Sequence, residues 1–273
     1  MEAPTKRVEI IPAKRRALIL EHLRINGAAS IQELADSIGG SQSTIRRDLE
    51  HLMEGGYLER THGGALLVPP LQATFERESQ INAHMQRAQK IAIGAEAALR
   101  INNRESVIFE ASSTVMEVVR AAALRDLSLT VVTNSLEIAQ VSSDVPSWRV
   151  IMPGGTIRPG GWRSLWGEPG ESFFNTVHAD VCVTGAYAVS GNVLTDAALE
   201  VASLKRKMIQ SSRRTIVVVD SSKFSAPSFS TFCELSAIDE LITDDGIKPE
   251  YLEALQSYGT KVTVVPMKGT APR

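Results

Sequence analysis

The sequence is poor in the residues that build disulfide frameworks and metal sites. Its two cysteines, Cys182 and Cys233, lie far apart and form no CxxC pair, so they are most simply buried thiols. The five histidines also lie apart, without metal-ligand spacing, and no Walker P-loop occurs. We therefore expect neither a metal nor a cofactor.

Long apolar runs and a charge of one sign are missing as well. No run is long enough to cross a membrane, and residues 1 to 7 lack the apolar core of a signal peptide. The formal net charge is −2, with 22% charged and 43% hydrophobic residues, which is ordinary for a globular protein. We expect a cytoplasmic protein without a membrane partner, and its 273 residues leave room for two domains.

The N-terminal part predicts two short helices. An amphipathic stretch over residues 16 to 23 ends at Asn26-Gly27, a helix-stop signal. Ser30 and Glu33 have the spacing of a capping box, in which each side chain satisfies a backbone donor of the other residue. That box would begin a second helix, which ends at Ile38.

A third helix follows the turn Gly39-Gly40. Ile45, Leu49 and Leu52 recur at helical spacing and would pack inward. Short polar residues and arginines, which can reach base edges and phosphates, are left facing outward. These outward residues are Gln42, Ser43, Arg46, Arg47 and Glu50. The order helix, helix, glycine turn and helix is that of a helix-turn-helix, whose last helix enters the major groove of DNA.

A short hairpin follows the three helices. Residues 57 to 60 and 65 to 68 flank a glycine turn at residues 61 to 64, and we interpret this hairpin as a wing. The alternative is a small helical subdomain whose arginines are solvated, but the ordered set of elements favours a winged helix-turn-helix domain over residues 1 to 68. Its predicted DNA-binding residues are Ser41, Gln42, Ser43, Thr44, Arg46, Arg47, His62 and Gly63.

Charge places a condition on that prediction. Residues 1 to 68 contain nine Lys and Arg and nine Asp and Glu, so the domain is not basic as a whole. Affinity for DNA would then depend on local clusters, with the acidic residues turned away from the phosphates. The clusters are Lys14-Arg15-Arg16, Arg46-Arg47 and Arg60.

A polar connector over residues 69 to 84 leads to a second domain, residues 85 to 273, in which strands and helices alternate. Short apolar runs, typical of strands buried on both faces, lie at residues 107–109, 129–132, 148–152, 181–183, 215–219 and 241–242. Helical patterns lie at residues 85–99, 114–124, 135–141, 197–210 and 249–257, the first with Ile91, Ala95, Ala98 and Leu99 available for burial. We predict an α/β domain with a largely parallel sheet.

Five of the predicted strand ends carry small or polar residues. In open α/β sheets ligands bind beyond the carboxyl ends of the strands, where glycine amides, hydroxyls and a helix N-terminus receive a phosphate. Turn and capping chemistry explains any single loop. Five such loops at one edge of the sheet favour a site for a phosphorylated sugar or polyol, because carboxylates accept hydrogen bonds from its hydroxyls. The predicted ligand-binding residues are Glu110, Ser112, Ser113, Thr114, Asn134, Gly154, Gly155, Arg158, Gly185, Ala186, Lys205, Asp220, Ser222 and Lys223.

These motifs resemble the DeoR family of bacterial sugar-metabolism regulators. Residues 14 to 68 are similar through Thr44-Ile-Arg-Arg-Asp-Leu-Glu and His62-Gly-Gly-Ala. The remainder, to about residue 265, is similar through Thr133-Asn-Ser, Gly154-Gly, Arg158, Gly185-Ala, Leu194-Thr195, Lys205-Arg-Lys-Met-Ile and Asp220-Ser-Ser-Lys-Phe. Two positions depart from the family pattern: Gly40 stands where an apolar residue is usual, and Glu110-Ala-Ser-Ser-Thr-Val stands where Asp-Ala-Gly-Ser-Thr-Thr is usual.

The resemblance implies a repressor of an operon, with Ser43, Thr44, Arg46 and Arg47 on operator DNA. It also implies a second domain similar to ribose-5-phosphate isomerase, where a phosphorylated sugar or related metabolite acts as effector. We expect a homo-oligomer and no catalysis. Two alternatives stay open at this point: an active sugar-phosphate isomerase fused to a DNA-binding module, and a DNA-binding protein whose second domain only dimerises.

Overall fold

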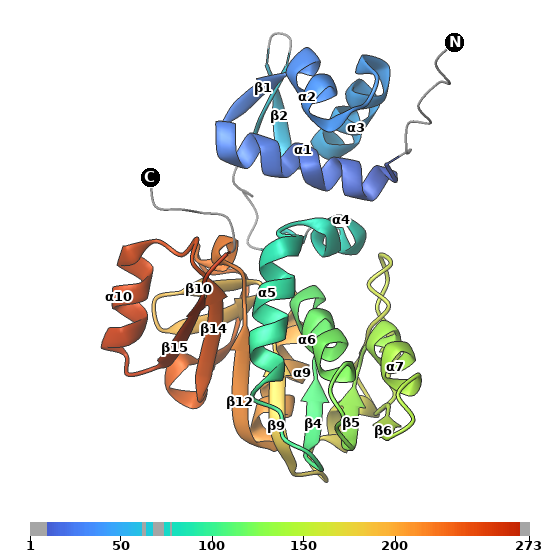
Figure 1. Ribbon diagram of the computed structural model, residues 1–273, viewed down its shortest axis with the longest axis vertical. Helices are drawn as coiled ribbons and strands as arrows, with labels where there is room; N and C mark the ends of the chain where they lie inside the picture. The colour runs from blue at the N-terminus through green and yellow to red at the C-terminus, as the bar shows by residue number, and fades with distance from the viewer. Residues whose placement is uncertain (1–9, 62–63, 68–73, 77, 268–273) are drawn as a thin grey trace. The chain divides into compact units, whose positions relative to one another are not determined.

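The computed structural model describes residues 10–61, 64–67, 74–76 and 78–267. The chain divides into two compact units, Met1–Met85 and Gln86–Arg273 (Figure 1). Each unit has a hydrophobic core of its own. Within the described residues no helix is both long and apolar enough to cross a membrane.

The first unit contains the predicted helices and hairpin strands. Its helices are α1 Pro12–Asn26, α2 Ile31–Ile38, α3 Gln42–Glu54 and α4 Ser79–His84. Its strands are β1 Ala28–Ser30, β2 Leu58–Thr61 and β3 Gly64–Leu67, which pair antiparallel in the order β1-β3-β2. The turn between β2 and β3 includes His62 and Gly63, which lie outside the described residues.

Local capping fixes where α2 and α3 begin. The Ser30 side chain accepts from the backbone N–H of Glu33 at 3.2 Å, and the Glu33 carboxylate accepts from the Ser30 N–H at 2.7 Å, which confirms the predicted capping box. Ser41 caps α3 by accepting from the Thr44 N–H at 3.1 Å. Gly39 ends α2 with φ 84°, a left-handed conformation that favours glycine.

The first unit extends beyond the predicted boundary at residue 68. Residues 79–84, which the sequence assigns to a connector, form α4 and pack on α1. Ile81 and Met85 are buried in the same core as Leu20, Leu23 and Leu52. The apolar face of the last part of the connector therefore stabilises the first unit.

The second unit is built on a parallel sheet of seven strands in the order β15-β14-β12-β9-β4-β5-β6. The strands are β4 Ser106–Phe109, β5 Leu129–Thr133, β6 Trp148–Ile151, β9 Ala179–Thr184, β12 Ser212–Val218, β14 Glu240–Asp244 and β15 Lys261–Val265. This confirms the predicted α/β fold with a largely parallel sheet. The edge strand β15 has no counterpart in the sequence prediction.

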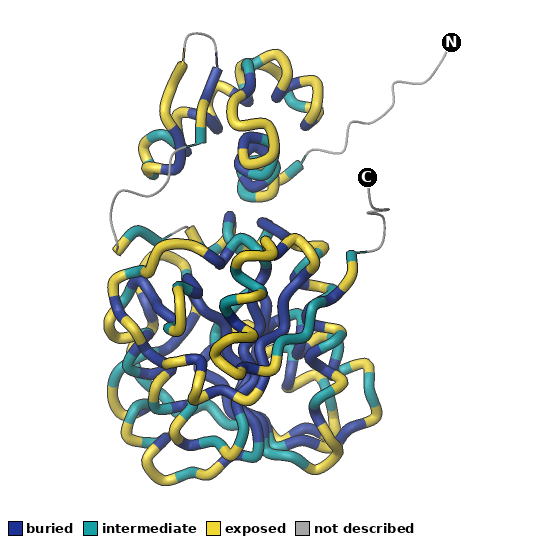
Figure 2. Tube along the Cα trace, turned by 90° about the vertical axis from the view of Figure 1, so that its left-hand side faces the viewer, coloured by how far each residue is buried: buried dark blue, intermediate teal, exposed yellow. Residues whose placement is uncertain are grey.

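Helices cover both faces of this sheet. The helices are α5 Arg87–Ala98, α6 Ser113–Ala123, α7 Leu136–Ser143, α9 Leu199–Gln210 and α10 Pro249–Ser257. Helices α5, α6 and α7 share one core with Phe109 and Val218, whereas α9 and α10 contribute to cores that include Val217 and Cys182 on the other face. Figure 2 shows the strands as a buried centre with exposed segments around it.

Short elements complete the second unit. An antiparallel sheet of β10 Ala188–Ser190, β11 Val193–Asp196 and β13 Ser230–Glu234 packs beside α9. A two-stranded hairpin, β7 Thr156–Ile157 and β8 Leu165–Trp166, follows β6. After the hairpin come α8 Gly170–Phe173 and, past β12, a 3-10 turn at Ser221–Lys223.

The predicted buried face of α5 is wrong. Ile91, Ala95 and Leu99 are exposed, and only Ala98 of the predicted set is buried. The buried side contains Ile93, Gly94 and Ala97, because α5 packs most closely on α6 at Gly94. A β-carbon on Gly94 would lie 2.6 Å from the backbone of Glu117, a separation that only glycine allows.

Candidate nucleic-acid interface and ligand pocket

Helix α3 has one buried and one exposed side. Ile45, Leu49 and Leu52 are 0%, 4% and 0% exposed, as the helical spacing predicts. The predicted DNA-binding residues Ser41, Gln42, Ser43, Arg46 and Arg47 are exposed, and Thr44 is half-buried. These six residues lie within the first two turns of one helix, so the structure brings them together, while their contacts with DNA stay a prediction.

Asp48 departs from its neighbours because it faces inward and is 2% exposed. Its carboxylate accepts from the guanidinium groups of two arginines of α1, Arg15 and Arg16, the latter with an Nε–Oδ1 distance of 3.1 Å. In the predicted phosphate-binding cluster Lys14-Arg15-Arg16, Arg15 and Arg16 are therefore already paired within the chain, and their contact with phosphates stays a prediction. Their charges hold α1 against α3, because a buried carboxylate needs charged donors.

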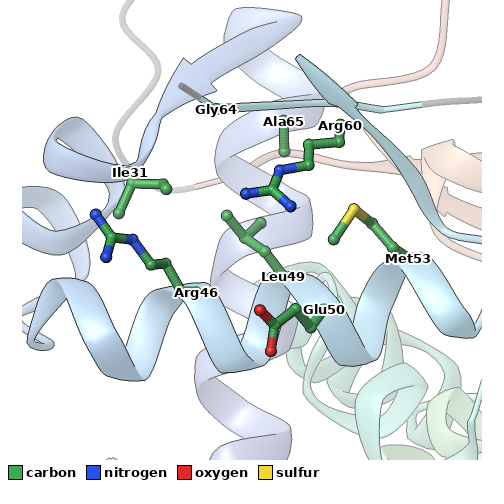
Figure 3. Close-up of a pocket in the computed structure, with 8 residues that line it drawn as sticks. All are labelled: Ile31, Arg46, Leu49, Glu50, Met53, Arg60, Gly64 and Ala65. Carbon is green, nitrogen blue, oxygen red and sulfur yellow. The ribbon is translucent and has the colours of Figure 1, made fainter. Parts of the chain in front are cut away.

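Arg46, Arg47 and Arg60 differ from those two arginines. All three side chains are exposed, and among the residues that the structure describes they form no hydrogen bond or ion pair. Arg46 belongs to α3 and Arg60 to β2, and both line a groove between the helix and the hairpin strands (Figure 3). The groove is shallow, with a cavity volume of about 20 Å³. Two unpaired guanidinium groups on its walls suit a phosphate backbone.

Gly64 lets the hairpin strand β3 approach β1 closely. A β-carbon at this position would lie 2.1 Å from the carbonyl oxygen of Ala29 in β1, so no larger residue fits. Gln42 is also positioned by a neighbour, because its Nε2 donates to Oε1 of Gln32 in α2. Gln32 in turn donates to the carboxylate of Asp36 at 2.8 Å.

In the second unit, the predicted loops after β4 and β5 meet the β7–β8 hairpin at Asn134. The Asn134 side chain accepts from the Ala111 N–H at 3.0 Å and donates to the Leu165 carbonyl at 3.0 Å. The loop after β4 is joined to the loop after β9, because Glu110 Oε2 accepts from the Gly185 N–H at 3.2 Å. The carboxyl ends of β4, β5 and β9 therefore form one wall of a site.

Lys205 lies at the centre of this site and is 4% exposed. Its Nζ donates to Oδ2 of Asp196 at 2.7 Å and to the Gly185 carbonyl at 3.0 Å, and it lies 3.6 Å from Oε1 of Glu110. Burial lowers the pKa of Lys205, but the negative charges of Asp196 and Glu110 outweigh this effect, and the pKa is raised. Burial raises the pKa of Glu110 despite the nearby Lys205 ammonium.

A small pocket opens beside these charges. It is lined by Glu110, Ala111, Asn134, Arg158, Ser164, Leu165, Trp166, Val201, Leu204 and Lys205. The Arg158 guanidinium lies over two indole rings, 4.2 Å from the Trp162 ring centre and 5.3 Å from that of Trp166. The cavity volume of the pocket is about 10 Å³, roughly the room for one water. A sugar-sized ligand would need the hairpin side chains to move.

The N-terminus of α6 lies next to the pocket residues Glu110 and Ala111. Ser112 caps this helix by accepting from the Val115 N–H at 3.2 Å. A β-carbon on Gly185 would lie 2.7 Å from Ser112 Oγ, so glycine lets the two loops approach. Ser113 is half-buried and Thr114 is 5% exposed, both in the first turn of α6.

The remaining predicted ligand-binding residues lie elsewhere. Asp220, Ser222 and Lys223 are not among the residues that line the pocket. They form a separate cluster. Burial raises the pKa of Asp220, but the charges of Lys223 and Lys90 and the hydrogen bonds from Ser222 outweigh burial, so the pKa lies below its usual value. Ala186 is buried in an apolar core.

Gly154 and Gly155 have a structural role before the hairpin. Their φ values are 88° and 123°, which favour glycine. A β-carbon on Gly155 would lie 2.5 Å from the Trp166 carbonyl oxygen. Sequence reasoning did not single out Asp196, because it ends a four-residue strand and its pairing with Lys205 leaves no local pattern.

Comparison with known proteins gives two family matches. Residues 15–70 match the DeoR-like helix-turn-helix domain, and residues 85–245 match the DeoR C-terminal sensor domain. No described group of three or more His, Cys, Asp or Glu residues could hold a metal ion.

Similar proteins include three bacterial regulators. An uncharacterized HTH-type transcriptional regulator, YulB of Bacillus subtilis, is 32% identical, covering 94% of this chain and 98% of its own length. The HTH-type transcriptional repressor GlcR of the same species is 31% identical, covering 92% of this chain and 95% of its own length. A putative aga operon transcriptional repressor of Escherichia coli O157:H7 is 30% identical, covering 93% of this chain and 94% of its own length.

Among solved structures, ribose 5-phosphate isomerase A of Methanocaldococcus jannaschii aligns with 14% identity and a TM-score of 0.38. The alignment covers 50% of this chain and 53% of that chain. A likeness at this level is too distant to indicate a function.

Proposed function

Because the chain belongs to the DeoR family of transcriptional regulators, we propose that it represses a sugar or polyol catabolic operon and leaves its operator when a phosphorylated sugar or polyol binds the second unit. The family and the relatives are regulators, so the isomerase alternative is set aside. The match of residues 85–245 to a sensor domain favours ligand binding over dimerisation alone.

The DNA-binding proposal rests on which arginines of the first unit form ion pairs within the chain. Within the described residues of the first unit, Arg46, Arg47 and Arg60 form no ion pair, whereas Arg15 and Arg16 are held by Asp48. Arg46 of α3 and Arg60 of β2 line the groove in Figure 3, and Arg47 follows Arg46 on the exposed side of α3. They are available for phosphates and guanine edges.

The pocket around Lys205 supports a polar, anionic effector. Arg158 supplies a cation for a phosphate, while Asn134 and the Glu110 carboxylate suit sugar hydroxyls. Because the pocket has room for roughly one water, effector binding requires Arg158 and the tryptophans beside it to move. A metabolite can then favour one arrangement of the protein over another. We also expect a homo-oligomer, because helix-turn-helix dimers bind paired half-sites.

The DNA-binding part of the proposal is tested with purified full-length protein and operator DNA. Replacing Arg46 or Arg47 with Ala should weaken specific binding by about 1–3 kcal/mol for each base or phosphate hydrogen-bonding pair that the substitution removes, and should lower the salt dependence of binding. Arg149→Ala is the matched control, because Arg149 is an exposed arginine of β6 in the second unit.

Affinity is measured by gel shift at several salt concentrations, with the fold checked by circular dichroism. If both α3 variants bind the operator as tightly as the Arg149→Ala control, the assignment of α3 to DNA is wrong. A thermal-shift screen with sugar and polyol phosphates then identifies the effector, since a ligand of the native state raises the unfolding temperature.

A further inference from the structure

Glu50 is a negatively charged residue on the side of α3 that carries the predicted DNA contacts. Residues three, four and seven apart share one side of a helix. Glu50 therefore lies on the same side of α3 as Ser43, Arg46 and Arg47. All four side chains are exposed. Glu50 is thus on the same surface as the predicted DNA contacts, one turn further along the helix.

The surroundings of Glu50 are cationic and apolar. It lines the groove with Arg46 from α3 and Arg60 from β2, and the other walls are mainly apolar (Figure 3). Within the described residues Glu50 forms no hydrogen bond or ion pair, and the same holds for the two arginines. The carboxylate is therefore available to a partner outside the chain.

DNA offers few groups that such a carboxylate could bind. Phosphates repel it, and so do the acceptor atoms N7 and O6 of guanine and O4 of thymine in the major groove. Adenine presents an amino group, but its acceptor N7 lies directly beside that group. Cytosine presents the N4 amino group without a neighbouring acceptor on its major-groove edge, which makes it the best partner for a Glu side chain.

We propose that Glu50 is a specificity-determining residue, whose carboxylate accepts a hydrogen bond from the N4 amino group of a cytosine in each operator half-site. The inference rests on the proposed DNA-binding function and adds to it a named base. The flanking arginines bind phosphate or guanine, while Glu50 excludes bases that present only acceptors. A regulator with Glu50 should therefore require a C·G pair at one position of its half-site.

The test is selection of binding sites from random double-stranded DNA by the full-length protein and its variants. The wild type should select a motif with one position fixed as C·G, and changing that pair to T·A should weaken binding roughly 5- to 150-fold. Glu50→Ala should keep the rest of the motif and lose the preference at this position. Glu50→Gln should shift it to adenine, because an amide pairs with adenine N6 and N7.

Glu54→Ala is the matched control. Glu54 is an exposed carboxylate at the C-terminal end of the same helix, so its removal changes the net charge equally and should leave the motif unchanged. If Glu50→Ala selects the wild-type motif with an unchanged C·G position, the inference is overturned. A wild-type protein that selects no motif at all would overturn the proposed function itself, which is a distinguishable result.

Discussion

Asp48 lies in the middle of the motif Thr44-Ile-Arg-Arg-Asp, yet it faces away from the surface that carries Arg46 and Arg47. It is 2% exposed and receives the guanidinium groups of Arg15 and Arg16. One short motif therefore serves two purposes, since its arginines are presented outward while its aspartate fastens α3 to α1.

Replacing Asp48 with Asn should destabilise the first unit by about 1–3 kcal/mol, because hydrogen bonds to a charged group are removed and two arginines lose their partner. The control is Asp36→Asn, an exposed residue of α2 whose carboxylate accepts only from Gln32 among the described residues. Its effect should stay within about 0.5 kcal/mol.

Urea unfolding separates the two units in this experiment. All three tryptophans, Trp148, Trp162 and Trp166, lie in the second unit, so their fluorescence follows that unit alone. For Asp48→Asn the far-UV circular dichroism should lose helix at lower urea while the fluorescence transition stays in place. Unchanged circular dichroism would show that the pairing of Asp48 contributes little.

Single residues were predicted from the sequence where the signal is local. The burial of Ile45 and Leu49 follows from helical spacing, and the capping box follows from two residues three apart. The pairing of Arg15 with Asp48 spans 33 positions and leaves no local pattern. The burial of Lys205 depends likewise on Glu110, on a distant strand end.

At the scale of elements, α5 shows why a pattern can predict a helix and still assign the wrong face. Alanine is common on both sides of α5, so apolar spacing alone does not distinguish them. The contact with α6 decides, because only Gly94 lets the two helices approach. The strand β15 and the small sheet β10-β11-β13 were missed, since Lys261 and Thr263 interrupt β15 and β10 has three residues.

Gly94→Ala should destabilise the second unit. The added methyl would meet the Glu117 backbone at 2.6 Å, and overpacking of this kind costs about 1–3 kcal/mol, more than the roughly 1 kcal/mol that alanine gains in helix propensity. Ala95→Ser, at the exposed neighbouring position, is the control. Tryptophan fluorescence in urea measures both variants, and a Gly94→Ala protein as stable as wild type would contradict the close packing of α5 on α6.

At the scale of the whole molecule, the two-part organisation follows from the sequence, because helix-turn-helix and α/β patterns occupy different stretches. The site was only partly predictable. Glu110, Asn134 and Lys205 meet at the ends of β4, β5 and β9, whereas Asp220 follows β12 and is held in another cluster by Lys223 and Lys90. Because β12 pairs directly with β9, even neighbouring strand ends of one sheet need not serve one ligand.

Regulation requires that the effector bind the free protein more tightly than the operator-bound protein. In the proposed function the effector binds in the pocket beside Arg158, and its binding changes the affinity of α3 for DNA. Arg158→Gln removes the guanidinium proposed to bind the phosphate and should leave operator affinity unchanged without effector. Arg163→Gln is the matched control, since Arg163 is an exposed hairpin residue that pairs with Glu137.

The most direct measurement is the affinity of full-length protein for labelled operator, by fluorescence anisotropy, with and without the phosphorylated sugar or polyol selected by thermal shift. We expect this ligand to weaken wild-type and Arg163→Gln binding by about tenfold or more and to leave Arg158→Gln binding unchanged. The proposed regulation is contradicted if no phosphorylated sugar or polyol alters operator affinity, or if Arg158→Gln releases the operator at the wild-type ligand concentration.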